Sequence, residues 1–72
     1  MLEAADVKPA KAEVDSFATV QFGKVRVWIG ESVIGDYTDK EMFDILPGRI
    51  YALEGLEDNT MVLIKETPKL IV

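Results

Sequence analysis

Apolar and polar residues alternate along most of the chain beyond position 16, with the period of two that is typical of β-strands. In residues 24–29, aliphatic residues fall on one face of an extended chain and larger or charged residues on the other. The aliphatic face consists of Val25, Val27 and Ile29, and the opposite face of Lys24, Arg26 and Trp28. Similar patterns predict strands over residues 17–22, 32–37, 42–46, 49–54 and 60–65, and a short edge strand over 69–72.

Glycine, proline and asparagine separate the predicted strands, so that a turn signal recurs roughly every eight to twelve residues. No segment between them has the periodicity of an amphipathic helix. This spacing predicts an all-β fold, either an antiparallel sandwich or a barrel.

The N-terminal residues follow a different pattern. Residues 2–7 favour a helical turn by propensity, Pro9 interrupts any longer helix, and the stretch up to position 14 is rich in alanine and charge. We therefore assign residues 1–14 to an N-terminal arm, partly extended, which is either disordered or docked on a neighbouring subunit. Residues 15–72 are assigned to the β domain.

The chain has 72 residues and forms one small domain, and such a domain buries only about 60% of the surface of its unfolded chain. It contains no cysteine and no histidine, so disulfides and the usual transition-metal ligands are missing. We expect no metal and no cofactor. Oligomerisation is the expected source of the additional burial that small domains need.

The net charge of −5 argues against a nucleic-acid partner, because phosphate groups favour a basic protein face. No apolar run is long enough to span a bilayer, and the first residues lack the apolar core of a secretory signal. We therefore expect a cytoplasmic protein with neither a nucleic-acid nor a membrane partner.

Three segments carry a resemblance to a known family. Residues 43–48 form an apolar strand that ends in a Pro-Gly turn, and Tyr51 follows three residues after the glycine. Residues 22–27 contain a Gly-x-Val-x-Val turn and strand, and residues 57–64 a polar loop with a closing strand. Over residues 17–65 the chain therefore resembles a small cupin, and this implies an antiparallel jelly-roll β-barrel.

The metal ligands of the cupins do not carry over to this chain. Ala10, Ala12 and Ser16 stand where the resemblance places two histidines and a glutamate. Tyr51 stands where it places a third histidine, and Gly55 near the position of an asparagine. The resemblance thus implies a metal-free cupin-like barrel and favours a protein that is not an enzyme.

Tyr51, Tyr37 and Arg49 are the candidates for a ligand pocket in the mouth of the barrel. The two hydroxyls could donate to a sugar-like ligand, and Arg49, two residues from Tyr51, could bind a carboxylate or phosphate. The structural alternative is that the tyrosines pack in the core and that Arg49 pairs with Asp44 or Glu54. A filled interior would favour this alternative, and its expected contributors are Val25, Val27, Phe43 and Ile45.

Trp28, Met61 and Leu63 are the candidate interface residues. Trp28 lies on the outward face of its predicted strand, where a tryptophan is a good interface anchor unless the N-terminal arm covers it. Residues 60–65 are apolar on both faces, which indicates that Met61 and Leu63 contact another subunit or the arm. These residues together predict a homodimer.

Three functional hypotheses follow. The first is a non-catalytic, metal-free cupin-like module, oligomeric, with a binding or structural role. The second is a small-molecule binding protein, or a weak isomerase or lyase, that uses the pocket of Tyr51, Arg49 and Tyr37. The third is a phage or mobile-element accessory protein that attaches through its N-terminal arm.

Overall fold

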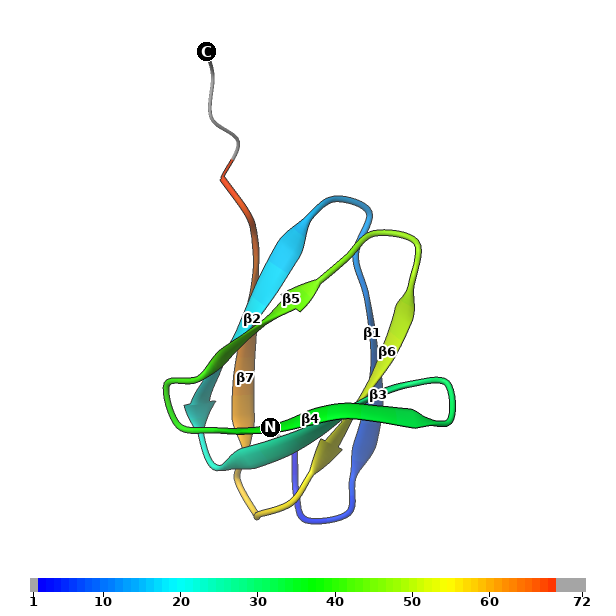
Figure 1. Cartoon of the computed structure of the whole chain (residues 1–72). Helices are drawn as coiled ribbons and strands as arrows, with labels where there is room; N and C mark the ends of the chain where they lie inside the picture. Colours follow the sequence, from blue (N-terminus) through cyan, green and yellow to red (C-terminus); the bar gives the residue numbers. More distant parts are fainter. Residues whose placement is uncertain (1, 69–72) are drawn as a thin grey trace.

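The structure is a computed structural model that describes residues 2–68, and its described part consists of antiparallel strands joined by turns (Figure 1). The strands are β1 (Val7–Lys11), β2 (Ser16–Phe22), β3 (Lys24–Ile29), β4 (Ser32–Thr38), β5 (Met42–Ile45), β6 (Ile50–Gly55) and β7 (Met61–Glu66). The all-β class predicted from the alternation is confirmed. The edge strand predicted over 69–72 lies outside the described residues.

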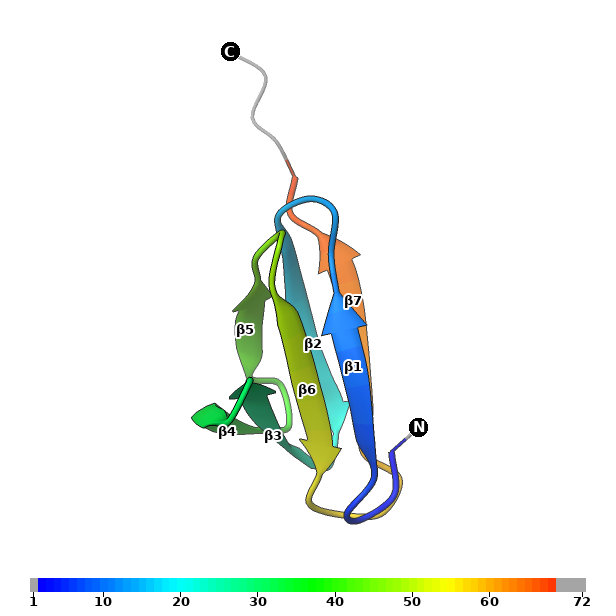
Figure 2. The same cartoon turned by 90° about the vertical axis from the view of Figure 1, so that its right-hand side faces the viewer.

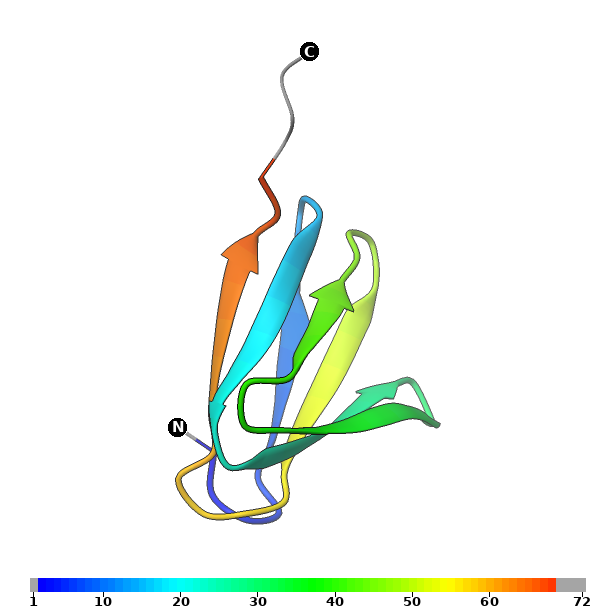
Figure 3. The same cartoon turned by 60° about the vertical axis from the view of Figure 1, so that its left-hand side comes forward.

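The strands form two antiparallel sheets. The four-stranded sheet has the order β1-β6-β3-β4, and the three-stranded sheet the order β5-β2-β7. Figure 3 shows the three-stranded sheet in front, with β7 in orange at its edge, β2 in cyan and β5 in green. Buried side chains of both sheets form one core, which contains Leu2, Ala10, Ala18, Val20, Val25, Val27, Phe43, Ile45, Tyr51 and Leu53.

The alternation in the sequence locates the strands closely. The segment predicted over 24–29 is β3 itself, and each of the five other predictions within the described residues lies within one residue of a strand. On β3 the predicted inner residues Val25 and Val27 are fully buried. The period of two is thus a reliable guide here because one face of each sheet packs on the core.

The two sheets do not close into the barrel predicted from the sequence. β1 and β7 are edge strands of different sheets, and Figure 2 shows both at the same side of the molecule. Among the described residues, the isolated bridge between Leu2 and Thr60 joins the chain ahead of these two strands, with both N–H···O distances at 2.8 Å. Beyond this bridge β1 and β7 do not pair, so the sandwich is open along the seam between these two strands. The jelly-roll topology is not confirmed.

The N-terminal residues differ from the predicted arm. β1 pairs with β6 of the same chain, and both Leu2 and Ala10 are buried in the core. Ahead of β1 the chain makes a tight turn, in which the Asp6 N–H donates to the Glu3 carbonyl oxygen at 3.0 Å, and no helical turn is found there. Pro9 is accepted within β1 because the strand lies at a sheet edge.

Gly23 joins β2 to β3 and is where the chain passes from one sheet to the other. Its φ of +87° lies in the left-handed region, and a Cβ atom there would approach the Thr60 Cα to 2.9 Å. Thr60 is fully buried, and its hydroxyl accepts the Lys24 N–H at 3.3 Å and lies 2.7 Å from the Glu57 carbonyl oxygen. Only glycine combines this backbone conformation with this close approach.

We expect Gly23→Ala to destabilise the fold more than Gly30→Ala. Gly30 has a φ of +60° with no atom near its missing Cβ, so its substitution tests the backbone conformation alone. That conformation costs an L-residue about 1–2 kcal/mol, and crowding against Thr60 adds about 1–3 kcal/mol at Gly23. Urea denaturation of both variants measures the difference, and equal losses of stability would show that the contact with Thr60 contributes nothing.

Candidate functional site

Tyr51 lies in the core rather than in an open pocket. It belongs to β6, opposite Ala10 of β1 and Ile29 of β3, and its side chain is 2% exposed. Its hydroxyl oxygen accepts the backbone N–H of Leu46 at 3.0 Å. This bond spans the turn between β5 and β6, so the phenol has a structural partner inside the chain.

Tyr37 and Arg49 do not join Tyr51 in a common site. Tyr37 is half-buried, and its ring stacks on Phe43 with a centroid distance of 4.7 Å and an interplanar angle of 28°. Gly35 leaves room for this ring, since a Cβ atom there would approach the Tyr37 hydroxyl to 2.9 Å. Arg49 is exposed in the turn ahead of β6.

The interior that a ligand would need is filled. Val25 and Val27 come from the four-stranded sheet, whereas Phe43 and Ile45 come from the three-stranded sheet, and all four are buried. These are the residues expected to fill the interior under the structural alternative. The arrangement therefore favours a structural role for Tyr51 and Tyr37.

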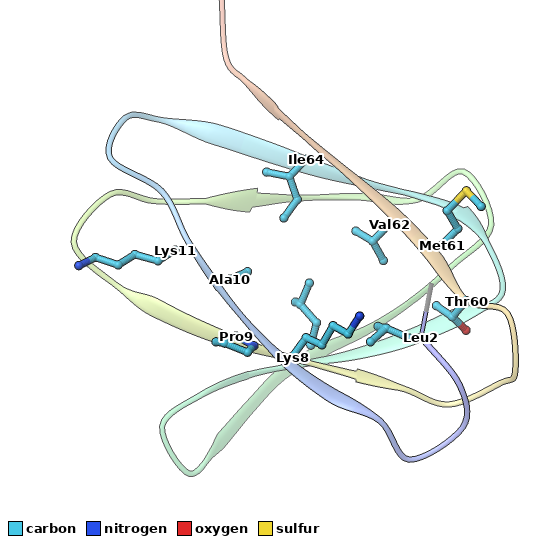
Figure 4. Close-up of a pocket in the computed structure, with 10 residues that line it drawn as sticks. Leu2, Lys8, Pro9, Ala10, Lys11, Thr60, Met61, Val62 and Ile64 are labelled. Carbon is cyan, nitrogen blue, oxygen red and sulfur yellow. The ribbon is translucent and has the colours of Figure 1, made fainter.

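A groove of about 380 Å³ lies at the open seam, away from the predicted pocket. Figure 4 shows the side chains that line it, with Lys11 extending away from the groove. The lining comes from β1, β6, β7 and the residues before β1 and β7, and consists of Leu2, Lys8, Pro9, Ala10, Lys11, Leu53, Thr60, Met61, Val62 and Ile64. No local pattern in the sequence predicts this groove, because strands from opposite ends of the chain form its two sides.

The groove offers few polar side chains. Its lining offers two lysines and a threonine, but no carboxylate, histidine or cysteine that could act as a base or nucleophile. Across residues 2–68, no group of three or more His, Cys, Asp or Glu side chains is placed to hold a metal ion. The groove is thus an apolar surface with a basic rim.

The outer face of the three-stranded sheet carries large exposed apolar side chains. The inner face of β7 is fixed by the pairs Val20–Val62 and Ala18–Ile64, so Met61 and Leu63 point outward. Leu63 pairs with Thr19, which also pairs with Met42 of β5. The exposed fractions on this face are 57% for Phe22, 56% for Met42, 46% for Met61 and 42% for Leu63.

A register shift explains why Phe22 joins this outer face. Simple alternation from the buried Val20 would turn Phe22 inward. The register of β2 against β7 shifts between Val20 and Phe22, and this places Phe22 opposite Met61. A β-bulge changes the face of the sheet on which the following side chains lie. The alternation of this segment does not predict the bulge.

Trp28 lies on the outer face of the four-stranded sheet, so the three candidate interface residues do not form one surface. Trp28 is half-buried, and its indole Nε1–H donates to the Glu54 carboxylate at 3.0 Å. Beside it, the Arg26 guanidinium binds both oxygens of Asp36, at 2.8 and 3.0 Å. These four side chains have polar partners within the chain, unlike the apolar side chains around Met61 and Leu63.

Comparison with models of protein families, with curated proteins and with solved structures finds no match to this chain. Within residues 2–68 there is no helix with the length and apolar character needed to cross a bilayer.

We expect Tyr51→Phe to lower the free energy of unfolding by about 0.5–1.5 kcal/mol, because the Leu46 N–H loses its acceptor. Tyr51→Ala should cost about 3–5 kcal/mol, since it also leaves a cavity in the core. Chemical denaturation of the two variants measures both losses. A Tyr51→Phe variant as stable as the natural chain would show that the hydroxyl is not needed for folding.

The Arg26–Asp36 pair predicts a pH dependence of stability. The hydrogen bonds from Arg26 hold the pKa of the Asp36 carboxyl below its ordinary value. A carboxyl with a lowered folded-state pKa stabilises the fold above its unfolded-state pKa of about 4, and this stabilisation is lost as the pH falls toward the folded-state value. Asp36→Asn should therefore lower the melting temperature at pH 7 and have little effect in acid.

The matched control for this prediction is Asp39→Asn, which also removes one negative charge but has no ion-pair partner among the described residues. Thermal melts of both variants between neutral and acidic pH separate the local pair from the effect of net charge. The same pH dependence in both variants would contradict a specific role for the pair.

Proposed function

We propose that this chain is a non-catalytic binding or structural module that acts as a homodimer, with β7 at the dimer interface. The observation that carries this proposal is the cluster of large exposed apolar side chains on the outer face of the three-stranded sheet. An exposed apolar patch of this kind is typical of a protein-contact surface, whereas isolated exposed apolar residues are not. Met61 and Leu63 lie within the cluster, and Phe22 and Met42 extend it.

The filled interior supports a non-catalytic role. Tyr51 uses its hydroxyl to hold the β5–β6 turn, and Arg49 is exposed outside the core. The alternative of a sugar-like or anionic ligand held by Tyr51, Arg49 and Tyr37 has less support, because these residues do not converge on one space. Attachment through an N-terminal arm also has less support, because Val7–Lys11 is already paired with β6.

A metal-free relationship to the cupins is part of the proposal. Its support is the Pro-Gly turn, in which Gly48 has a φ of +82° and connects β5 to β6, with Tyr51 following in β6. A positive φ explains why glycine is needed at this place in the turn. In this interpretation, a tyrosine that bonds to the turn replaces a metal ligand.

The homodimer is tested by Leu63→Thr, with Ile34→Thr as the control. Leu63 and Ile34 are both 42% exposed and both lie in edge strands, but Ile34 belongs to β4 of the other sheet. In a two-fold dimer the substitution occurs twice in the interface, so we expect Leu63→Thr to weaken dimerisation by about tenfold or more. Ile34→Thr should leave the dissociation constant unchanged.

Sedimentation equilibrium over a range of protein concentrations measures these constants. A natural chain that remains monomeric at several hundred micromolar would contradict the homodimer. Equal weakening by the two substitutions would show that the apolar cluster around β7 is not the contact surface.

A further inference from the structure

The edge strands of the two sheets differ in how well they are protected against pairing with another chain. β1 contains Pro9, β5 has only four residues, and β4 carries Gly35 and Asp36 beside a register shift. Proline, short length, charge and bulges are devices that discourage strand addition at an edge. β7 has six residues, Met61–Glu66, with no proline, and its first four residues are apolar.

The backbone of β7 presents regular hydrogen-bonding groups to the open seam. The Thr67 N–H donates to the Asp15 carbonyl oxygen at 2.9 Å. This bond identifies which residues of β7 direct their backbone N–H and C=O groups toward β2. Because facing and non-facing residues alternate in an antiparallel pair, the N–H and C=O groups of Val62, Ile64 and Glu66 point away from β2. Among the described strands none pairs with this edge.

The edge of β1, on the other side of the seam, cannot form a regular ladder of hydrogen bonds with an added strand. The Gly55 N–H donates to the Asp6 carbonyl oxygen at 2.8 Å, so Lys8 and Ala10 continue the pairing toward β6. The alternate residues, with Pro9 in the middle, point into the seam, and proline has no N–H to donate. Of the two edges at the seam, β7 is therefore the one that can accept another strand.

We propose that two copies of this chain pair their β7 strands antiparallel, centred on Leu63, so that two three-stranded sheets merge into one six-stranded sheet. This inference rests on the proposed homodimer and specifies its geometry. Met61 and Leu63 of the apolar cluster lie at the strand contact, whereas Phe22 and Met42 remain on the outer face of the merged sheet. The sequence of β7 is self-complementary about Leu63. Val62 lies opposite Ile64 of the second copy, the two Leu63 side chains lie opposite each other, and Met61 lies opposite Lys65 of the second copy.

Registers shifted to either side are less favourable. Centring on Val62 would set Thr60 opposite Ile64 of the second copy, but the Thr60 N–H and C=O are already bonded to Leu2. Centring on Ile64 would place Glu66 opposite Val62 and Lys65 opposite Leu63. Centring on Lys65 would place two like charges directly opposite each other, which is destabilising. The register on Leu63 sets aliphatic residues against aliphatic residues at its three central pairs and opposes no like charges.

The second copy also covers the groove at the seam. A strand added beside β7 lies next to Val62 and Ile64, which line the groove together with Leu2 and Ala10. Ile64 is 44% exposed although it belongs to the inner face of β7, so the single chain leaves apolar surface there in contact with water. Burying this surface favours association in addition to the backbone ladder.

Cross-linking through single cysteines tests the register, because the natural chain has no cysteine and every disulfide joins two copies. In the proposed pairing Leu63 forms a pair without hydrogen bonds, whose Cα atoms lie about 4.5 Å apart, within the range of disulfides. Leu63→Cys should therefore oxidise to a covalent dimer at least tenfold faster than Thr19→Cys. Thr19 lies opposite Leu63 on β2, so its two copies would lie about 14 Å apart, three strand spacings.

The two cysteine variants separate the possible dimers. Fast cross-linking of Thr19→Cys with slow cross-linking of Leu63→Cys would indicate that two outer faces stack, which overturns the edge pairing and keeps the homodimer. Slow cross-linking of both, with a natural chain that dimerises, would also overturn the edge pairing. A monomeric natural chain would overturn both proposals.

A second pair of variants tests whether backbone groups make the contact. Ile64→Pro removes an N–H that points away from β2, so it should spare the fold but weaken dimerisation at least tenfold more than Ile64→Ala. Circular dichroism verifies the fold, and sedimentation equilibrium measures the dissociation constants. Equal constants for the two folded variants would show that side chains alone form the interface and would overturn the strand pairing.

Discussion

The close approach of Thr60 to Gly23 holds together two of the points where the chain changes sheets. β2 and β3 lie in different sheets and meet at Gly23, while β6 and β7 lie in different sheets and meet in the loop that ends at Thr60. The buried Thr60 hydroxyl accepts the Lys24 N–H, and the Thr60 backbone bridges to Leu2. One residue thus connects these two crossings and the N-terminal residues. A larger residue at position 23 would separate them, because the backbone of Thr60 cannot yield as a flexible side chain can.

This connection explains why the sandwich is closed at one end of the seam and open along the rest. The Leu2–Thr60 bridge holds the two edges together just ahead of β7, and past it β1 and β7 follow their own sheets, with β1 paired to β6 and β7 to β2. Without a strand between them, Val62 packs only partly against the core, and Ile64 is exposed beside the groove. A small domain has a small core, so the exposed apolar seam lowers the stability of the single chain. Burying this seam would favour association.

The parts of the fold that depend on local alternation could be predicted, and the parts that depend on distant contacts could not. β3 follows from the alternation that buries Val25 and Val27. The alternation does not predict β1, because Ala10 is the one buried residue of this strand and its pairing partner Tyr51 lies far along the chain. The sequence indicates the outward direction of Met61 and Leu63, because the segment is apolar on both faces. The outward direction of Phe22 depends on the bulge in β2. Alternation suggested a shared face for Arg49 and Tyr51, but Tyr51 is buried in the core and Arg49 is exposed ahead of β6, where the alternation of a strand does not apply.

Tyr51 shows how a chain without histidine or cysteine can stabilise the centre of such a fold. Its ring fills the core between β1 and β3, and its hydroxyl holds the backbone of Leu46 just ahead of the Pro-Gly turn. This side chain accepts a backbone N–H and fills space in the core, so its role is to stabilise the fold. Moving it toward a ligand would leave a cavity and an unpaired donor. The surface available for function is therefore outside the core, along the exposed side of β7 and the seam beside it.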